Sequence, residues 1–116
     1  MPTSQLDLER QDSGKADVAV VGLNGKLSLE TVHDFIATMR EEPAGLLILD
    51  MSKVSFLDSA GVGALVSLFV SRRNHNKRLF LAGLTSQGQA VMQVSGLIKL
   101  LPLYPLVEDA LAAAGK

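Results

Sequence analysis

The sequence contains no cysteine and no tryptophan, and aromatic residues occupy only 4% of its 116 positions. Without cysteine, disulfide scaffolds and cysteine-based metal sites are excluded. The same absence fits a reducing compartment, so we expect a cytoplasmic protein. Because aromatic residues are scarce, the core must be built from valine, leucine, isoleucine and alanine. A hydrophobic share of 47% and a charged share of 20% are typical of a globular protein.

The chain also lacks an excess of charge of one sign and any long apolar run. Eleven basic and 12 acidic residues give a net charge of −1, so we expect no direct nucleic-acid partner. The longest apolar stretch, residues 60–70, is much shorter than the roughly 20 residues that cross a bilayer. Residues 1–10 are polar and carry acidic side chains, so we expect no signal peptide. The sequence therefore predicts no membrane insertion.

The length predicts a single domain over residues 1–116, with flexible ends at 1–4 and 113–116. Strand-like and helix-like segments alternate, which predicts an α/β fold with one mixed sheet of four to five strands and about four helices. The expected strands are residues 16–23, 45–50, 78–82 and 100–104, the last at a sheet edge because proline flanks it. A first strand at 5–11 is expected to pair antiparallel with 16–23. The expected helices are one following Ser28 and running to about Glu42, then 59–74, 86–95, and one whose first turn holds Pro105.

Local signals refine these boundaries. Asn24-Gly25 indicates a turn or a bulge, and residues 51–57 are expected to form a loop. Thr31, with Asp34 three residues later, resembles a capping box and is an alternative start for the first helix. Leu68 and Val70 lie away from the expected core stripe of the second helix, so this helix either is broadly buried or has an exposed apolar margin for a partner. Apolar spacing predicts four core positions in the second helix and two inward valines in the third. These are Val62, Leu65, Val66 and Phe69, then Val91 and Val94.

Residues 54–63, VSFLDSAGVG, follow a core strand and open a helix. The first N–H groups of a helix lack intrahelical partners and carry partial positive charge, so a phosphate on Ser59 would sit in a favourable place. Alternatively, Asp58 or Ser59 is only an N-cap. Gly61 and Gly63 each weaken a helix by about 1 kcal/mol relative to alanine. Glycine at these positions is expected where another backbone or a ligand must come close to the helix.

Residues 50–65, DMSKVSFLDSAGVGAL, closely resemble the signature of STAS domains, the bacterial anti-sigma factor antagonists. Weaker similarities extend over the whole chain, at residues 25–27, 79–83 and 103–111. The resemblance implies a STAS fold and a switch rather than an enzyme, with no cofactor. In the family, a partner anti-sigma factor that is a Ser/Thr kinase phosphorylates the serine that matches Ser59. The unphosphorylated antagonist binds this kinase and releases the sigma factor, and a PP2C-type phosphatase resets the switch.

The resemblance also implies a partner-binding surface. Its expected members are Ser28, Asp58, Ser59, Ala60, Gly61 and Val62. Many relatives carry an acidic residue where this chain has Ser28. Phosphorylation adds about −1.5 to −2 charges. We expect a phosphate beside Asp58 to repel the partner without unfolding the domain.

Two other functions are compatible with the sequence. A cytoplasmic STAS subunit of an ABC-type lipid transporter, or a small nucleotide-binding domain, are the alternatives. His33 and His75 are expected at the surface, Asp50 is expected to close a strand, and no metal-ligand spacing occurs. A basic cluster is expected to stabilise the end of the second helix, and consists of Arg72, Arg73, Lys77 and Arg78. We expect a monomer or a weak dimer.

Overall fold

The computed structural model describes residues 5–115 and confirms the mixed α/β fold. Within these residues five strands form one sheet in chain order: β1 (Leu6–Gln11), β2 (Val18–Leu27), β3 (Leu46–Leu57), β4 (Arg78–Ala82) and β5 (Leu103–Tyr104). β1 runs antiparallel to β2, as predicted, and the other neighbours are parallel. The helices are α1 (Val32–Arg40), α2 (Ser59–Asn74), α3 (Ser86–Ser95) and α4 (Val107–Ala113), with a 3₁₀ turn η1 (Leu97–Lys99). Of the ends expected to be flexible, residues 1–4 and 113–116, residues 1–4 and 116 lie outside the described residues.

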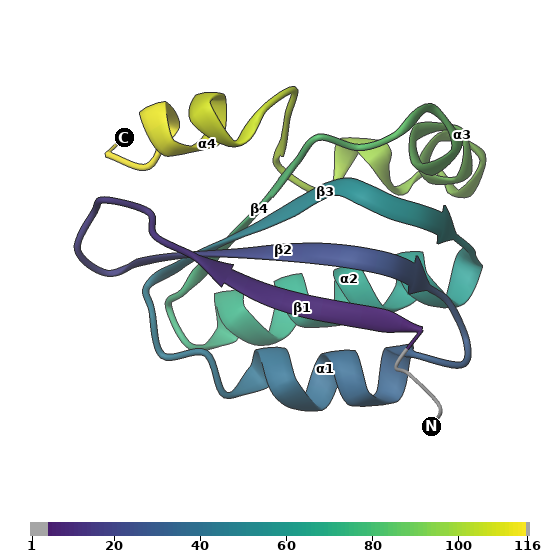
Figure 1. Cartoon of the computed structure of the whole chain (residues 1–116), viewed down its shortest axis with the longest axis horizontal. Coiled ribbons are helices and arrows are strands. Elements are labelled where there is room, and N and C mark those ends of the chain that lie inside the picture. The colour runs from purple at the N-terminus through teal and green to yellow at the C-terminus, as the bar shows by residue number, and fades with distance from the viewer. Residues whose placement is uncertain (1–4, 116) are drawn as a thin grey trace.

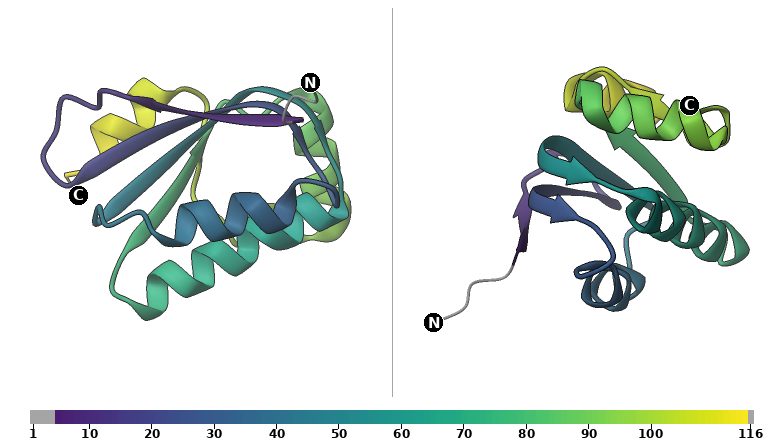
Figure 2. Two further views of the ribbon diagram at one scale, coloured as in Figure 1. Left: turned by 60° about the horizontal axis from the view of Figure 1, so that its bottom comes forward. Right: turned by 90° about the vertical axis from the view of Figure 1, so that its right-hand side faces the viewer.

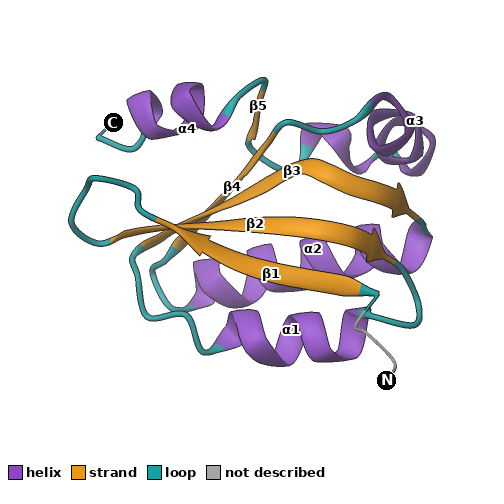
Figure 3. Cartoon of the chain, viewed as in Figure 1, coloured by secondary structure: helices purple, strands orange, loops and turns teal. Residues whose placement is uncertain are grey.

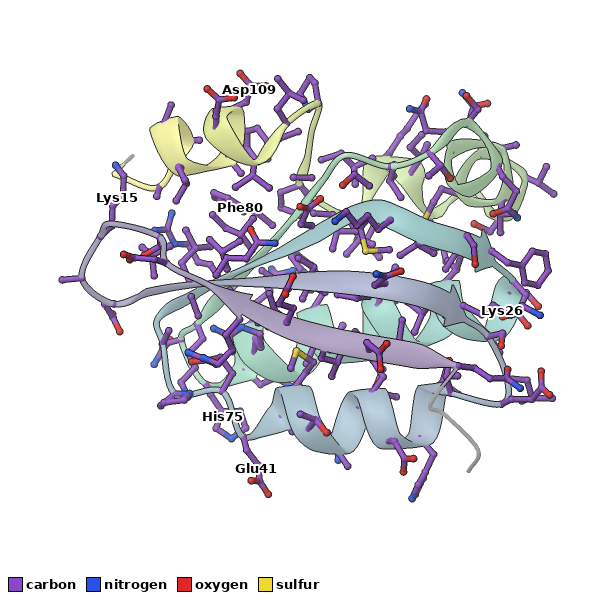
Figure 4. The ribbon with its side chains drawn as sticks, in the orientation of Figure 1. Lys15, Lys26, Glu41, His75, Phe80 and Asp109 are labelled. Carbon is purple, nitrogen blue, oxygen red and sulfur yellow. The ribbon has the colours of Figure 1, made fainter. Side chains whose placement is uncertain are left out.

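The sheet separates two unequal layers (Figures 1 and 3). α1 and α2 lie side by side on one face, and α4 lies on the other (Figure 2). The larger core forms under α1 and α2, and Met92 of α3 joins it. The smaller core lies between the sheet and α4 and includes Phe80, which is labelled in Figure 4. The ring centroids of Phe80 and Tyr104 are 4.9 Å apart. Because β3 is covered on both faces near its start, it reads as a continuous apolar run.

The expectation of a loop at residues 51–57 is wrong, because β3 continues to Leu57. β2 also continues to Leu27, so the two strands remain paired beyond Asp50. The pairing register shifts between Gly22 and Asn24 and again between Gly25 and Lys26. Asn24-Gly25 therefore lies in a bulged strand rather than a turn. Asp50 does not close a strand, and its Oδ1 accepts hydrogen bonds from the N–H and hydroxyl of Ser52.

α1 begins at Val32, after a tight turn. The hydroxyl of Thr31 donates to the carbonyl of Lys26 at 2.8 Å and accepts from the N–H of Ser28 at 3.0 Å. The Thr31 hydroxyl therefore bonds to β2 and to the turn and not to the first N–H groups of α1. The expected capping box does not form. α4 likewise starts later than expected, two residues after Pro105.

One expectation about side-chain position is wrong. Val94 is 90% exposed, because α3 turns Gly88 and Met92 toward the core instead. Arg72 lies in the last turn of α2, as expected of the basic cluster, but its side chain is almost completely buried. Its guanidinium donates to three backbone carbonyls, those of Arg78, Glu42 and Ala44. Burial lowers the pKa of Arg72, opposed by the negative charges of Glu42 and Asp17.

The remaining surface expectations are straightforward. His33 and His75 are exposed, as predicted. Leu68 is fully buried, which removes it from any apolar margin, whereas Val70 is about half exposed. None of the helices within residues 5–115 has the length and apolar character needed to cross a bilayer.

Candidate functional site

Asp58 holds two segments together at the start of α2. Its Oδ1 accepts from the N–H of Gly61 at 2.8 Å, which makes it the N-cap. Its Oδ2 accepts from the N–H of Leu29 at 3.1 Å, and its own N–H donates to the carbonyl of Leu27 at 3.4 Å. Of the two predicted N-cap residues, Asp58 is therefore the one that caps α2. Capping does not explain why a serine occupies position 59.

Ser59 is the first residue of α2 and its side chain is exposed. Among the described residues, its hydroxyl makes no hydrogen bond, and neither its N–H nor that of Ala60 has a partner. A helix start with unpaired N–H groups favours negative charge. The hydroxyl is therefore accessible, and the backbone around it is suited to a phosphate.

The two glycines of the first turns have different roles. A Cβ on Gly61 would come within 2.3 Å of the carbonyl oxygen of Leu27 and 2.7 Å of a methyl of Leu57. Gly61 is therefore required for the helix to approach β2, as the sequence suggested. A Cβ on Gly63 would meet nothing within 4 Å. Gly63 is exposed and lies one turn after Ser59, on the same side of the helix.

The other sequence-predicted residues divide into exposed and buried groups. Asp58 and Ala60 are half-buried beside Ser59 and reach the surface. Gly61 and Val62 are buried beneath them, and Ser28 is only 3% exposed. The hydroxyl of Ser28 has no hydrogen-bond partner among the described residues. These three residues position the surface from below rather than presenting side chains on it.

Two exposed apolar side chains near Ser59 were missed. Leu29 is 73% exposed and Phe56 is 44% exposed. Leu29 is three residues ahead of Val32, a spacing that would bury it in a helix, but α1 begins too late to include it. Phe56 is opposite Lys26, where the register shift skips Ser55 and turns Phe56 outward. Lys26 marks this end of the sheet in Figure 4. Neither exposure has a signal in the local sequence.

Metal chemistry finds no support in the described part of the chain. Within residues 5–115, no group of three or more histidine, aspartate or glutamate side chains is placed to hold a metal ion. The candidate site consists of the exposed hydroxyl of Ser59, the Asp58 carboxylate that caps α2, and the exposed apolar side chains of Leu29 and Phe56.

A family model described as the STAS domain matches residues 9–110. The chain belongs to the STAS domain family. The match spans most of the sheet and all of the site around Ser59. Among curated proteins, an anti-sigma-B factor antagonist from Listeria monocytogenes is 25% identical to this STAS chain over 92 residues, covering 79% of this chain and 81% of the relative.

Solved structures share the fold. A candidate anti-sigma factor antagonist from Thermotoga maritima superposes with a TM-score of 0.85 at 18% identity, covering 94% of this chain and 95% of the other. An anti-sigma factor antagonist from Mycobacterium paratuberculosis gives 0.81 at 24% identity, covering 96% and 95%. The STAS domain of a SulP transporter from Vibrio cholerae gives 0.70 at 27% identity, covering 86% and 82%. The first two likenesses establish the fold of this STAS domain and nothing further.

Proposed function

We propose that this STAS domain is an anti-sigma factor antagonist switched by phosphorylation of Ser59. In its unphosphorylated form it binds an anti-sigma factor that is a Ser/Thr kinase, and this binding releases the sigma factor. The kinase transfers the γ-phosphoryl group of ATP to the Ser59 hydroxyl, which gives up its proton, and ADP leaves. A PP2C-type phosphatase then hydrolyses the phosphate ester and restores binding.

One observation carries this proposal. The hydroxyl of Ser59 is exposed and unbonded among the described residues, although the neighbouring Asp58 already caps the helix. Ser59 is therefore not needed to start α2, and its hydroxyl is available for modification. The name of the Listeria relative supports the class of function. Expected cytoplasmic location and the absence of enzymatic activity remain predictions.

The site explains how one phosphate would act. Leu29 and Phe56 offer apolar surface on which a partner gains free energy by excluding water. A phosphate on Ser59, beside the Asp58 carboxylate, would add up with it to about three negative charges at the start of α2. A partner that packs there would have to desolvate this charge. The unpaired N–H groups of the helix start would accommodate the phosphate, so the fold survives.

The test uses the intact chain as bait in extracts of the cells that produce it, followed by mapping of phosphorylated residues. A co-purifying histidine-kinase-like ATPase, together with phosphate on Ser59, supports the proposal. The Ser59→Ala chain should recover the same ATPase but carry no phosphate. Recovery of no kinase, or phosphate only at other serines, would contradict it.

A second candidate function is favoured by the likeness to the SulP transporter domain. In that case the chain would be a cytoplasmic STAS subunit of a membrane transporter, such as an ABC-type lipid transporter. The same bait experiment distinguishes the two functions, because a permease or transport ATPase would then be recovered in place of the kinase. Binding would also be insensitive to Ser59→Asp.

A further inference from the structure

β1 lies at one edge of the sheet. Among the described residues it pairs only with β2. The carbonyl of Gln5 accepts from the N–H of Lys26 at 2.8 Å, so the odd-numbered residues of this strand direct their backbone groups to β2. Leu8 and Arg10 then direct theirs away from the sheet. An edge strand of this kind can receive another extended chain.

Two cavities lie between this edge and α1. Figures 1 and 2 show α1 facing β1 across this region. One cavity of about 370 Å³ lies at the start of β1, and a second of about 380 Å³ lies toward its end. Leu8 and Thr38 line both cavities, so the two adjoin and together form a groove along β1. The floor is apolar, formed by Leu6, Leu8, Phe35 and Met39. Six strand residues extend about 20 Å, enough for an extended peptide of similar length.

The rim of the groove is acidic. Four carboxylates and one guanidinium line it: Glu30, Asp34, Glu41, Glu42 and Arg10. Arg10 forms an ion pair with Glu42. Glu30, Asp34 and Glu41 are exposed and form no ion pair within residues 5–115. A second copy of this chain would bring its own acidic rim against these carboxylates, which disfavours pairing of two β1 edges.

The geometry points to a docking site for an extended, basic segment of a partner polypeptide, added as a sixth strand along β1. Its backbone pairs with Leu8 and Arg10, and its alternate apolar side chains contact the floor. Its lysine or arginine side chains lie near Glu30, Asp34 and Glu41. This site does not require Ser59 to be phosphorylated. It begins beside Leu29, so one partner can occupy both surfaces.

The test uses two synthetic octapeptides, acetylated and amidated, that alternate valine with lysine or valine with glutamate. Each is titrated into the ¹⁵N-labelled full chain and followed by amide chemical shifts. The lysine peptide should shift the amides of Leu8, Arg10 and the first turn of α1, and should bind at least tenfold more tightly than the glutamate peptide. Equal affinity, no binding at millimolar concentration, or shifts confined to other surfaces would overturn the proposal.

Two matched double variants test whether the acidic side chains of the rim attract the peptide. Glu30→Gln with Asp34→Asn removes two charges from the groove, whereas Asp7→Asn with Glu9→Gln removes two from the opposite face of β1. The first pair should weaken the lysine peptide at least fivefold and the second less than twofold. Equal weakening would indicate only net-charge attraction. Sedimentation of the free chain tests the other occupant, since a dimer that protects the β1 amides would assign the groove to a second copy.

Discussion

The carboxylate of Asp58 joins the start of α2 to the N–H of Leu29, a residue 29 positions earlier in the chain, at 3.1 Å. Its other oxygen caps the helix through Gly61 at 2.8 Å. One side chain thus fixes both the helix that begins with Ser59 and the turn that presents Leu29.

Asp58→Ala should lower the free energy of unfolding by about 1–2 kcal/mol, because the loss of a cap typically costs about 1 kcal/mol and the bond to Leu29 is lost as well. Chemical denaturation measures the change, and hydrogen exchange should show faster exchange at Leu29 and Gly61. Asp34→Ala is the control, since Asp34 is an exposed acidic residue of α1 outside the site. Equal destabilisation by the two variants would show that Asp58 has no special role.

The two glycines of α2 should respond oppositely to alanine. Gly61→Ala forces a methyl against the Leu27 carbonyl and should cost about 1–3 kcal/mol, the usual range for overpacking. Gly63→Ala meets open space and should raise stability by up to about 1 kcal/mol through helix propensity. Thermal unfolding of the two variants gives the comparison. Two changes of the same sign would refute the assignment of Gly61 to close packing.

α2 could be predicted because the signals for its start and end lie in the neighbouring sequence. An aspartate cap, followed by a helical run and ended by a polar turn, requires no knowledge of other elements. The same reasoning failed for residues 51–57, which become part of β3 only because β2 extends beside them. Strand pairing of this kind joins residues about 30 positions apart. The sequence window around Val54 does not include the residues of β2 that pair with it.

Exposure was also difficult to predict. Phe56 faces outward because of a register shift with β2, and Arg72 is buried because three carbonyls from other segments surround it. Both positions depend on tertiary contacts. The expected phosphorylated serine, by contrast, came from a resemblance over residues 50–65, and the structure leaves that hydroxyl accessible. The apolar flanks of the site became visible only in three dimensions.

Stability should depend on pH through Glu42. Burial by itself raises the pKa of Glu42, but hydrogen bonds from Arg10 and the Ala44 N–H, with the charges of Arg10 and Arg72, hold the pKa below its ordinary value. A carboxyl with a lowered pKa stabilises the fold above its unfolded pKa of roughly 4.3 and loses this effect as pH falls through the folded value.

The melting temperatures of the unmodified chain and of Glu42→Gln should therefore differ by a constant amount from pH 7 to pH 5, and the difference should shrink below about pH 4.3. Glu41→Gln is the control, because Glu41 is exposed and forms no ion pair among the described residues. A difference that grows as the pH falls would mean that the pKa of Glu42 is raised instead.

Leu29→Ser should weaken binding to the partner kinase by about tenfold while changing stability by less than about 0.5 kcal/mol, because an exposed side chain contributes little to the fold and much to an interface centre. Phe56→Ser should act in the same direction. Val94→Ser is the control, since Val94 is still more exposed but belongs to α3. Calorimetric titration measures affinity, and indistinguishable affinities for the three variants would exclude Leu29 and Phe56 from the interface.

The central claim is that phosphorylation of Ser59 ends partner binding. The affinity of the kinase for variants of Ser59 tests this claim most directly. The kinase recovered with the Ser59→Ala chain is titrated with three variants: Ser59→Ala, Ser59→Asp and Ser67→Asp. Ser67 is an exposed serine two turns further along α2, so it controls for added charge on the same helix. We expect Ser59→Ala and Ser67→Asp to bind within twofold of the unmodified chain and Ser59→Asp to bind at least tenfold more weakly. Equal affinity of Ser59→Ala and Ser59→Asp would contradict the switch.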